Sequence, residues 1–224
     1  MENVYQMSGY TLHLIPTQKF KTMTISLRLQ SPLLKETTTM RTLLTFVMMA
    51  ATQDYPSTKS LARYLDENYG ASLSTHITTK GKSHVINVTT SFVNDAYLPT
   101  KENLLEKQLL SDLFYRPLIV DNGFDETIVQ LKKKELKEKL QANKDDKFSY
   151  SLDKLFEYMG RDQVLGIPST GYENEIQKIT PQQLYQYMKK CIVEDEKHIY
   201  VVGDIPENIV DIFQRLLQFP EQYY

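Results

Sequence analysis

With 224 residues, of which 41% are hydrophobic, the chain is long and apolar enough to bury a core, which excludes a disordered polypeptide. A formal net charge of -2 excludes a bulk attraction to nucleic acid or to an anionic membrane. The longest nearly apolar run, residues 43–51, falls far short of the roughly 20 residues that cross a bilayer. One cysteine, Cys191, permits no internal disulfide, and the first ten residues show no basic and apolar leader, so we expect a cytoplasmic protein.

Two strands open the predicted fold. Tyr10–Pro16 is the first, and residues 21–29 form the second, in which hydrophobic side chains at 23, 25, 27 and 29 alternate with polar ones. Because only a few residues, 16–20, separate the two, their spacing predicts an antiparallel hairpin.

A central helix is predicted next, beginning at the threonines 37–39 and extending from Met40 to the break at Tyr55-Pro56. One apolar stripe follows the helical period, and a second face carries Thr42, Thr45, Phe46 and Met49. Because the helix is apolar on nearly all sides, we expect it to be buried in the middle of the domain.

The next predicted helix is capped by Ser57 or Thr58 and ends at Gly70. Residues 73–79 and 83–92 are rich in β-branched side chains and flank Lys80-Gly81, which predicts a second hairpin. Residues 94–115 return to helical spacing and are predicted as a helix that ends at Arg116-Pro117.

The remaining chain is mostly helical in prediction. A long helix covers residues 124–143, and its lysine-rich segment LKKKELKEKL is interpreted as a solvated face. A helix over residues 148–159 is expected to turn Leu152, Leu155, Phe156 and Met159 inward, and a loop over 161–172 follows it. Thr180-Pro181 begins another helix, His198–Val202 is a short buried strand, and a last helix contains residues 209–216. The predicted fold class is α+β, an antiparallel-rich sheet covered by helices, in a single domain over residues 1–224.

In the order of these signals the chain resembles the insulinase/pitrilysin family of zinc metallopeptidases, the inverted zincins. The resemblance implies an insulinase/LuxS-like metallopeptidase half-domain and spans most of the chain. It rests on the opening strands and on four further segments: residues 52–56, 65–71 with their Leu-Asp-Glu and Tyr-Gly-Ala triplets, 165–171 with Leu-Gly, Pro and Gly, and 179–204 from Ile-Thr-Pro to Val-Val-Gly-Asp.

The resemblance places the family's H-x-x-E-H signature on Thr42, Thr45 and Phe46, by counting back from Thr52 and Pro56. In active members the two histidines bind zinc, the glutamate is the general base, and a downstream glutamate is the third ligand. All three signature residues are replaced here, so we expect no catalytic residues, no metal ligands and no zinc. The downstream glutamate corresponds to Glu135 or Glu138, a choice that stays open, and both are favoured as ordinary surface carboxylates.

The resemblance implies a non-catalytic pseudo-peptidase that pairs as a heterodimer with an active insulinase-like paralogue and binds peptide or protein, with no nucleic acid or membrane partner. It also implies that a second, similar domain is absent or truncated. A residual zinc metallopeptidase with atypical ligands is the alternative, and a structural subunit of a larger assembly is a third.

Other chemistry is weighed against these hypotheses. His13, His76, His84 and His198 are favoured as structural histidines over a new metal site. Cys191 follows two lysines that would lower the pKa of its thiol, but an inert cysteine is favoured.

Overall fold

The computed structural model describes residues 2–107, 110–161 and 163–220 as one mixed α and β fold. Eight strands and eight α-helices are found in this part of the chain, with 3-10 turns at Asp95–Tyr97 and Val164–Gly166. The strands are β1 Asn3–Met7, β2 Tyr10–Pro16, β3 Thr22–Pro32, β4 Ser72–Lys80, β5 Ser83–Val93, β6 Ile119–Val120, β7 Gly123–Phe124 and β8 Glu196–Gly203. The helices are α1 Lys35–Met48, α2 Thr58–Glu67, α3 Leu110–Tyr115, α4 Glu126–Asp145, α5 Lys147–Met159, α6 Glu173–Ile176, α7 Pro181–Glu194 and α8 Ile209–Leu216.

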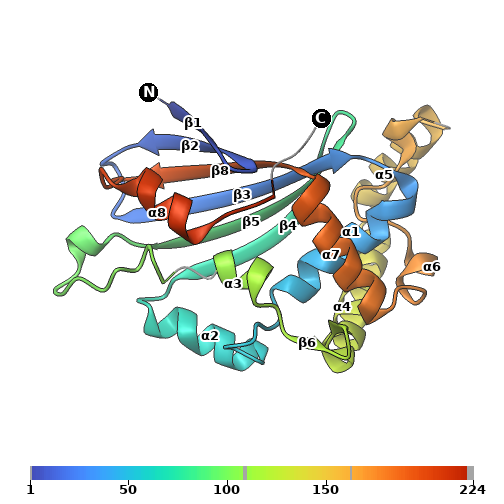
Figure 1. Cartoon of the computed structure of the whole chain (residues 1–224). Coiled ribbons are helices and arrows are strands. Elements are labelled where there is room, and N and C mark those ends of the chain that lie inside the picture. The colour runs from blue at the N-terminus through green and yellow to red at the C-terminus, as the bar shows by residue number, and fades with distance from the viewer. Residues whose placement is uncertain (1, 108–109, 162, 221–224) are drawn as a thin grey trace.

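The main sheet has six strands in the order β1-β2-β8-β3-β5-β4, and every neighbouring pair is antiparallel except β2 with β8. Along β2, β3 and β8 every second side chain is buried, so one face of the sheet is covered and the other is open. Helices α1, α7 and α8 cover that face, and α4 and then α5 lie beyond α1 (Figure 1). The predicted α+β class is confirmed.

The predicted hairpin of the two opening strands is wrong, because β8 lies between them. β8 pairs with β2 on one side and with β3 on the other. Its inward residues, from Lys197 to Gly203 in steps of two, are all buried, as is expected of a strand in the middle of a sheet. A short connection allows a hairpin but does not require one.

Two of the predicted helices are shorter than their periodicity indicates. α1 ends at Met48 rather than near Pro56, and the chain then turns so that Thr52 forms a β-bridge with Pro117. Between residues 94 and 115, only the 3-10 turn and α3 are helical among the described residues. Pro99 holds Leu98 in an extended conformation, and Asn103 has a positive φ of 53°, so a continuous helix is not possible.

Other local predictions are confirmed. Ser57 and Thr180 each form a capping box with the residue three positions on, and β4 and β5 form the second hairpin around Gly81. β1, which was not predicted, adds an edge strand. No helix among the described residues is long and apolar enough to cross a membrane.

α5 differs most from its prediction. None of its residues is buried, and the side chains expected to face inward are 38–65% exposed. α5 packs mainly against α4 and the 3-10 turn at Val164–Gly166.

Candidate functional site

An open groove of about 390 Å³ lies between α1, α4 and the edge strand β4. Its walls also include one residue of α2 and one of the loop before α6. Most of the lining side chains are threonines, lysines or apolar residues: Thr42, Thr45, Phe46, Met49, Thr58, Thr75, His76, Ile77, Lys132, Lys139 and Thr170. The groove therefore has the size of a small-molecule or peptide-side-chain site.

The α1 wall consists of the second helical face predicted from the sequence. Thr42, Thr45 and Phe46, the positions on which the resemblance places the zinc signature, all line the groove. The Thr42 hydroxyl donates to the Thr38 carbonyl at 3.0 Å, and the Thr45 hydroxyl donates to the Thr42 carbonyl at 2.8 Å. A hydroxyl committed in this way is a poor ligand for zinc, and a phenyl ring offers no ligand atom.

The α4 wall presents lysines. Lys132 and Lys139 are seven residues apart, close to two helical turns, and both line the groove. Glu135 lies just outside the lining, where it holds the Lys132 ammonium at 2.8 Å, and Glu138 is exposed and pairs loosely with Lys134 at 3.9 Å. Neither glutamate lines the groove. The lysine-rich segment of α4, which was interpreted as a solvated face, also supplies Lys132 and Lys139 to the groove and buries Lys133.

The β4 wall belongs to the edge of the sheet. β4 pairs with β5 alone among the described strands, so its other edge is free for a further strand. Thr75 fixes this edge to the central helix, because its hydroxyl donates to the Thr45 carbonyl at 2.6 Å. An extended peptide that adds to β4 would therefore run along the groove.

The loop that closes one end of the groove is held by polar contacts to α1 and β5. The Ser169 carbonyl accepts from the Thr42 hydroxyl at 3.3 Å and from the buried His84 ring at 2.9 Å. Burial, and then the charge of Arg41, lower the pKa of His84 to about 4, so this ring is neutral at pH 7. At Gly171 a Cβ atom would stand 2.5 Å from the Thr39 Cα, and φ is +84°, so only glycine lets the loop approach α1 this closely.

Beneath the groove α1 carries a buried ion pair that the sequence analysis did not anticipate. The Arg41 guanidinium lies 2.6 Å from the Asp195 carboxylate and donates to the Leu29 carbonyl at 2.7 Å and to the Cys191 Sγ at 3.3 Å. Burial, and then Asp195, raise the pKa of Cys191 to about 12. The neighbouring lysines therefore do not activate this thiol, in agreement with the inert cysteine favoured from the sequence.

Two of the four histidines meet on the open face of the sheet. The rings of His13 and His198 hydrogen-bond at 3.0 Å, and their outer nitrogens contact Glu2 at 2.7 Å and Glu196 at 3.0 Å. Because the Nε2 atom of His13 and the Nδ1 atom of His198 hydrogen-bond to one another, these nitrogens are not directed toward a common metal position. In the part of the chain that the structure describes, no group of three or more His, Cys, Asp or Glu side chains is arranged to hold a metal ion.

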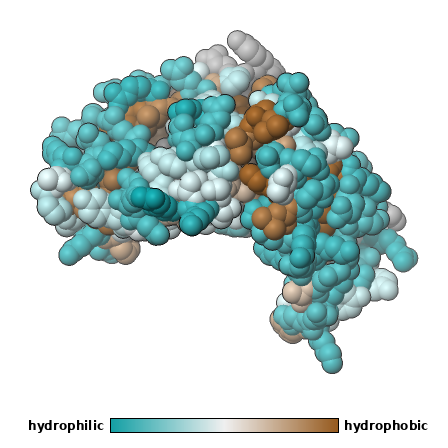
Figure 2. Space-filling model, turned by 90° about the horizontal axis from the view of Figure 1, so that it is seen from below, coloured by the Kyte–Doolittle hydropathy of each residue, from teal (hydrophilic) through white to brown (hydrophobic). Residues whose placement is uncertain are grey.

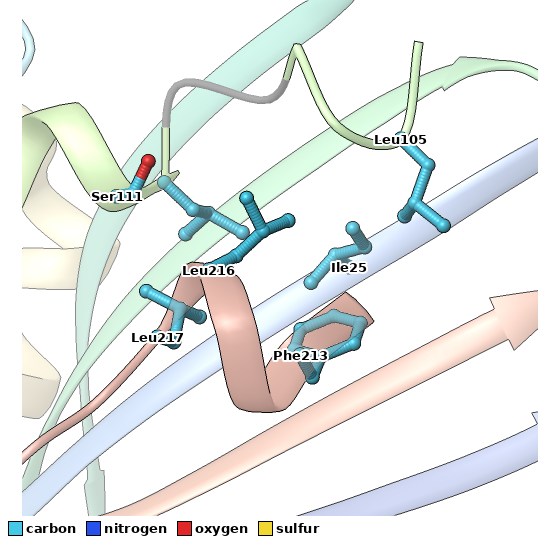
Figure 3. A pocket seen from close by; sticks show the side chains of 7 residues that line it. Ile25, Leu105, Ser111, Phe213, Leu216 and Leu217 are labelled. Atoms are coloured by element: carbon cyan, nitrogen blue, oxygen red, sulfur yellow. The ribbon is translucent and has the colours of Figure 1, made fainter. Parts of the chain in front are cut away.

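A second cavity, beside α8, is too small and too apolar to be a binding site. It measures about 10 Å³, room for no more than one water, and apolar side chains surround it apart from Ser111 (Figure 3). Phe213 and Leu216 of α8 face Ile25 of β3 across it. This cavity is a packing gap in the core rather than a binding site.

The groove thus has hydroxyls, ammonium groups and a free strand edge, but no set of metal ligands on α1. These groups can bind a polypeptide, but they do not activate a water molecule for peptide hydrolysis. The sequence analysis located the α1 wall but missed Lys132 and Lys139. Their spacing of seven, in phase with the buried Leu136 side of α4, was the signal available.

Comparisons with known proteins identify a curated relative and several solved structures that share the fold. No family model matches the chain. It is 37% identical over 204 residues to a Bacillus subtilis protein named "Probable inactive metalloprotease YmfF", and the match covers 90% of this chain and 48% of that protein.

Solved structures share the fold. A conserved protein from Enterococcus faecalis V583 matches with a TM-score of 0.92 and 32% identity over 99% of this chain and 53% of that chain. A peptidase M16 inactive domain from Pseudomonas fluorescens matches with a TM-score of 0.77 and 14% identity over 100% of this chain and 52% of that chain, which bears on the fold alone.

The chain spans about half the length of these relatives. The groove without zinc ligands and the likeness to a probable inactive metalloprotease agree with one another. The chain belongs to the insulinase family of metallopeptidases and resembles its non-catalytic members.

Proposed function

We propose that the protein is a non-catalytic, peptide-binding subunit that pairs with an active, zinc-bearing insulinase-type partner. The observation that carries the proposal is the position of the free β4 edge, which runs along a groove whose α1 wall carries Thr42, Thr45 and Phe46, the positions on which the resemblance places the zinc signature. Strand addition uses main-chain hydrogen bonds and needs no metal. A peptide can therefore be held in extended form without being cleaved.

The exposed face of α5 supports the partner half of this proposal. Seven of its 13 residues are large hydrophobic side chains that are exposed, and Phe148, Tyr158 and Met159 are 65–73% exposed. By contrast, the face of the molecule seen in Figure 2 is mostly hydrophilic, with apolar side chains confined to small areas. An apolar concentration of this kind is typical of a surface that another protein covers.

The length of the relatives supports the same view. They contain about twice the length of this chain, so a second half accompanies the matching half in each of them. We propose that a comparable half, carried by the partner, packs on α5 here. A heterodimer in the cytoplasm remains the prediction, in keeping with a single, buried, reduced cysteine.

Two measurements test the proposal. Mixing the chain with an insulinase-type protein that retains H-x-x-E-H is expected to give a 1:1 complex in size-exclusion chromatography with light scattering. A fluorescein-labelled, unstructured peptide is expected to bind, by anisotropy, equally well with and without a chelator. A chain that stays monomeric and binds no peptide would overturn the proposal.

A matched pair of variants locates the binding. Ile77→Trp fills the groove from β4 and is expected to abolish peptide binding. Val4→Trp adds the same bulk to β1, the edge strand at the opposite side of the sheet, and should leave binding unchanged. If Val4→Trp abolished binding and Ile77→Trp did not, the peptide would bind at the β1 edge instead.

A further inference from the structure

The geometry points to a ligand class for the groove: we propose that it selects an extended peptide segment that places an acidic side chain beside Lys139. This inference rests on the proposed peptide-binding function and adds a charge preference to it.

The charges on the groove walls have one sign. Its lining includes Lys132 and Lys139, and no aspartate or glutamate among the described residues. The whole chain has a net charge of -2, so this local excess is not a consequence of composition. A groove lined by one sign of charge attracts ligands of the other sign.

The two lysines are not equivalent. Glu135 binds the Lys132 ammonium through both carboxylate oxygens, at 2.8 and 3.0 Å, and only 14% of the Lys132 side chain is exposed. Lys139 has an exposed side chain, and its ammonium lies 5.4 Å from the centre of the Phe46 ring. Among the described residues Lys139 forms no ion pair, so its charge is the one available to a ligand.

The threonines exclude a simple anion site. The hydroxyls of Thr42, Thr45, Thr58 and Thr75 all donate to backbone carbonyls, so their oxygens offer only lone pairs to the groove. Such oxygens accept from peptide N–H groups and repel a bare phosphate. Acceptors beside a single free ammonium fit a peptide backbone that carries a carboxylate.

The experiment uses three labelled peptides that are identical except for a central Glu, Gln or Lys. The Glu peptide is expected to bind the full chain roughly tenfold more tightly than the Gln peptide, and the Lys peptide least tightly. The Lys139→Gln variant should bind the Glu and Gln peptides equally, and Lys139→Glu should prefer the Lys peptide. Circular dichroism confirms that each variant is folded.

Lys134→Gln is the matched control, because Lys134 lies on the same helix with 75% of its side chain exposed and does not line the groove. It should leave all three affinities unchanged, and inorganic phosphate at constant ionic strength should not displace the Glu peptide. Equal binding of the three peptides, or displacement by phosphate, would overturn the acidic preference while the peptide-binding function stands. Binding of none of them would overturn both.

Discussion

α1 and α5 have almost the same length and the same kind of apolar pattern, yet they occupy opposite environments. Nine of the 14 residues of α1 are buried, whereas none of the 13 residues of α5 is. α1 lies between the sheet and α4, while α5 packs mainly against α4 and the 3-10 turn at Val164–Gly166. The comparison teaches that an apolar stripe shows that a helix has a face to cover, but not whether this chain covers it.

The largest effect on stability is expected from a substitution in the buried helix of this comparison, α1. Arg41→Met removes the guanidinium that lies 2.6 Å from the buried Asp195 carboxylate, and we expect the free energy of unfolding to fall by about 3–5 kcal/mol. Urea denaturation measures this. Arg63→Met, which removes an exposed pair with Glu67 on α2, should change it by less than about 0.5 kcal/mol. Similar losses in both variants would contradict the structural role of Arg41.

A smaller effect depends on pH. His84 has a pKa of about 4 when folded and 6.5 when unfolded, so the unfolded chain binds the proton more readily. Its contribution to stability is complete above pH 6.5 and is lost as the pH falls toward 4, by about 3 kcal/mol in all. Denaturation at several pH values tests this.

His84→Gln keeps a donor for the Ser169 carbonyl but removes the titration. Its stability should therefore vary less with pH between 6.5 and 4 than that of the unchanged chain. An identical pH dependence in the two proteins would assign the acid sensitivity to other groups.

The smallest effect on stability is expected from a substitution in the exposed helix of this comparison, α5. Phe156→Glu places a charge on an exposed face, so the free energy of unfolding should change by less than about 0.5 kcal/mol, whereas complex formation with the partner should be lost. Leu44→Glu on α1 should prevent folding. If Phe156→Glu unfolds the chain, α5 is part of the core and the proposed partner surface is wrong.

Patterns confined to a few residues were predicted well, and pairings across the chain were not. The capping residues Ser57 and Thr180 and the β4–β5 hairpin follow from local hydrogen bonding. The insertion of β8 between β2 and β3 depends on residues far apart in sequence, which no local period encodes.

In the candidate site, too, residues on one helix could be predicted from their spacing, whereas residues brought in by tertiary packing could not. Thr42, Thr45 and Phe46 share one helix and could be placed together from their spacing. Lys132 and Lys139 reach them only through the packing of α4 on α1, so the lysine run looked like a solvated surface. The meeting of His13 and His198 likewise required the pairing of β2 with β8.

The place of β8 in the sheet also has a consequence for biosynthesis. Until residues 196–203 leave the ribosome, β2 and β3 each lack one of their two neighbours, the strand β8 that lies between them. At about 5–20 residues per second, that interval lasts roughly 10 to 40 s. During it the nascent chain exposes two unpaired strand edges, so we expect its yield to depend on a chaperone that shields them until β8 has emerged.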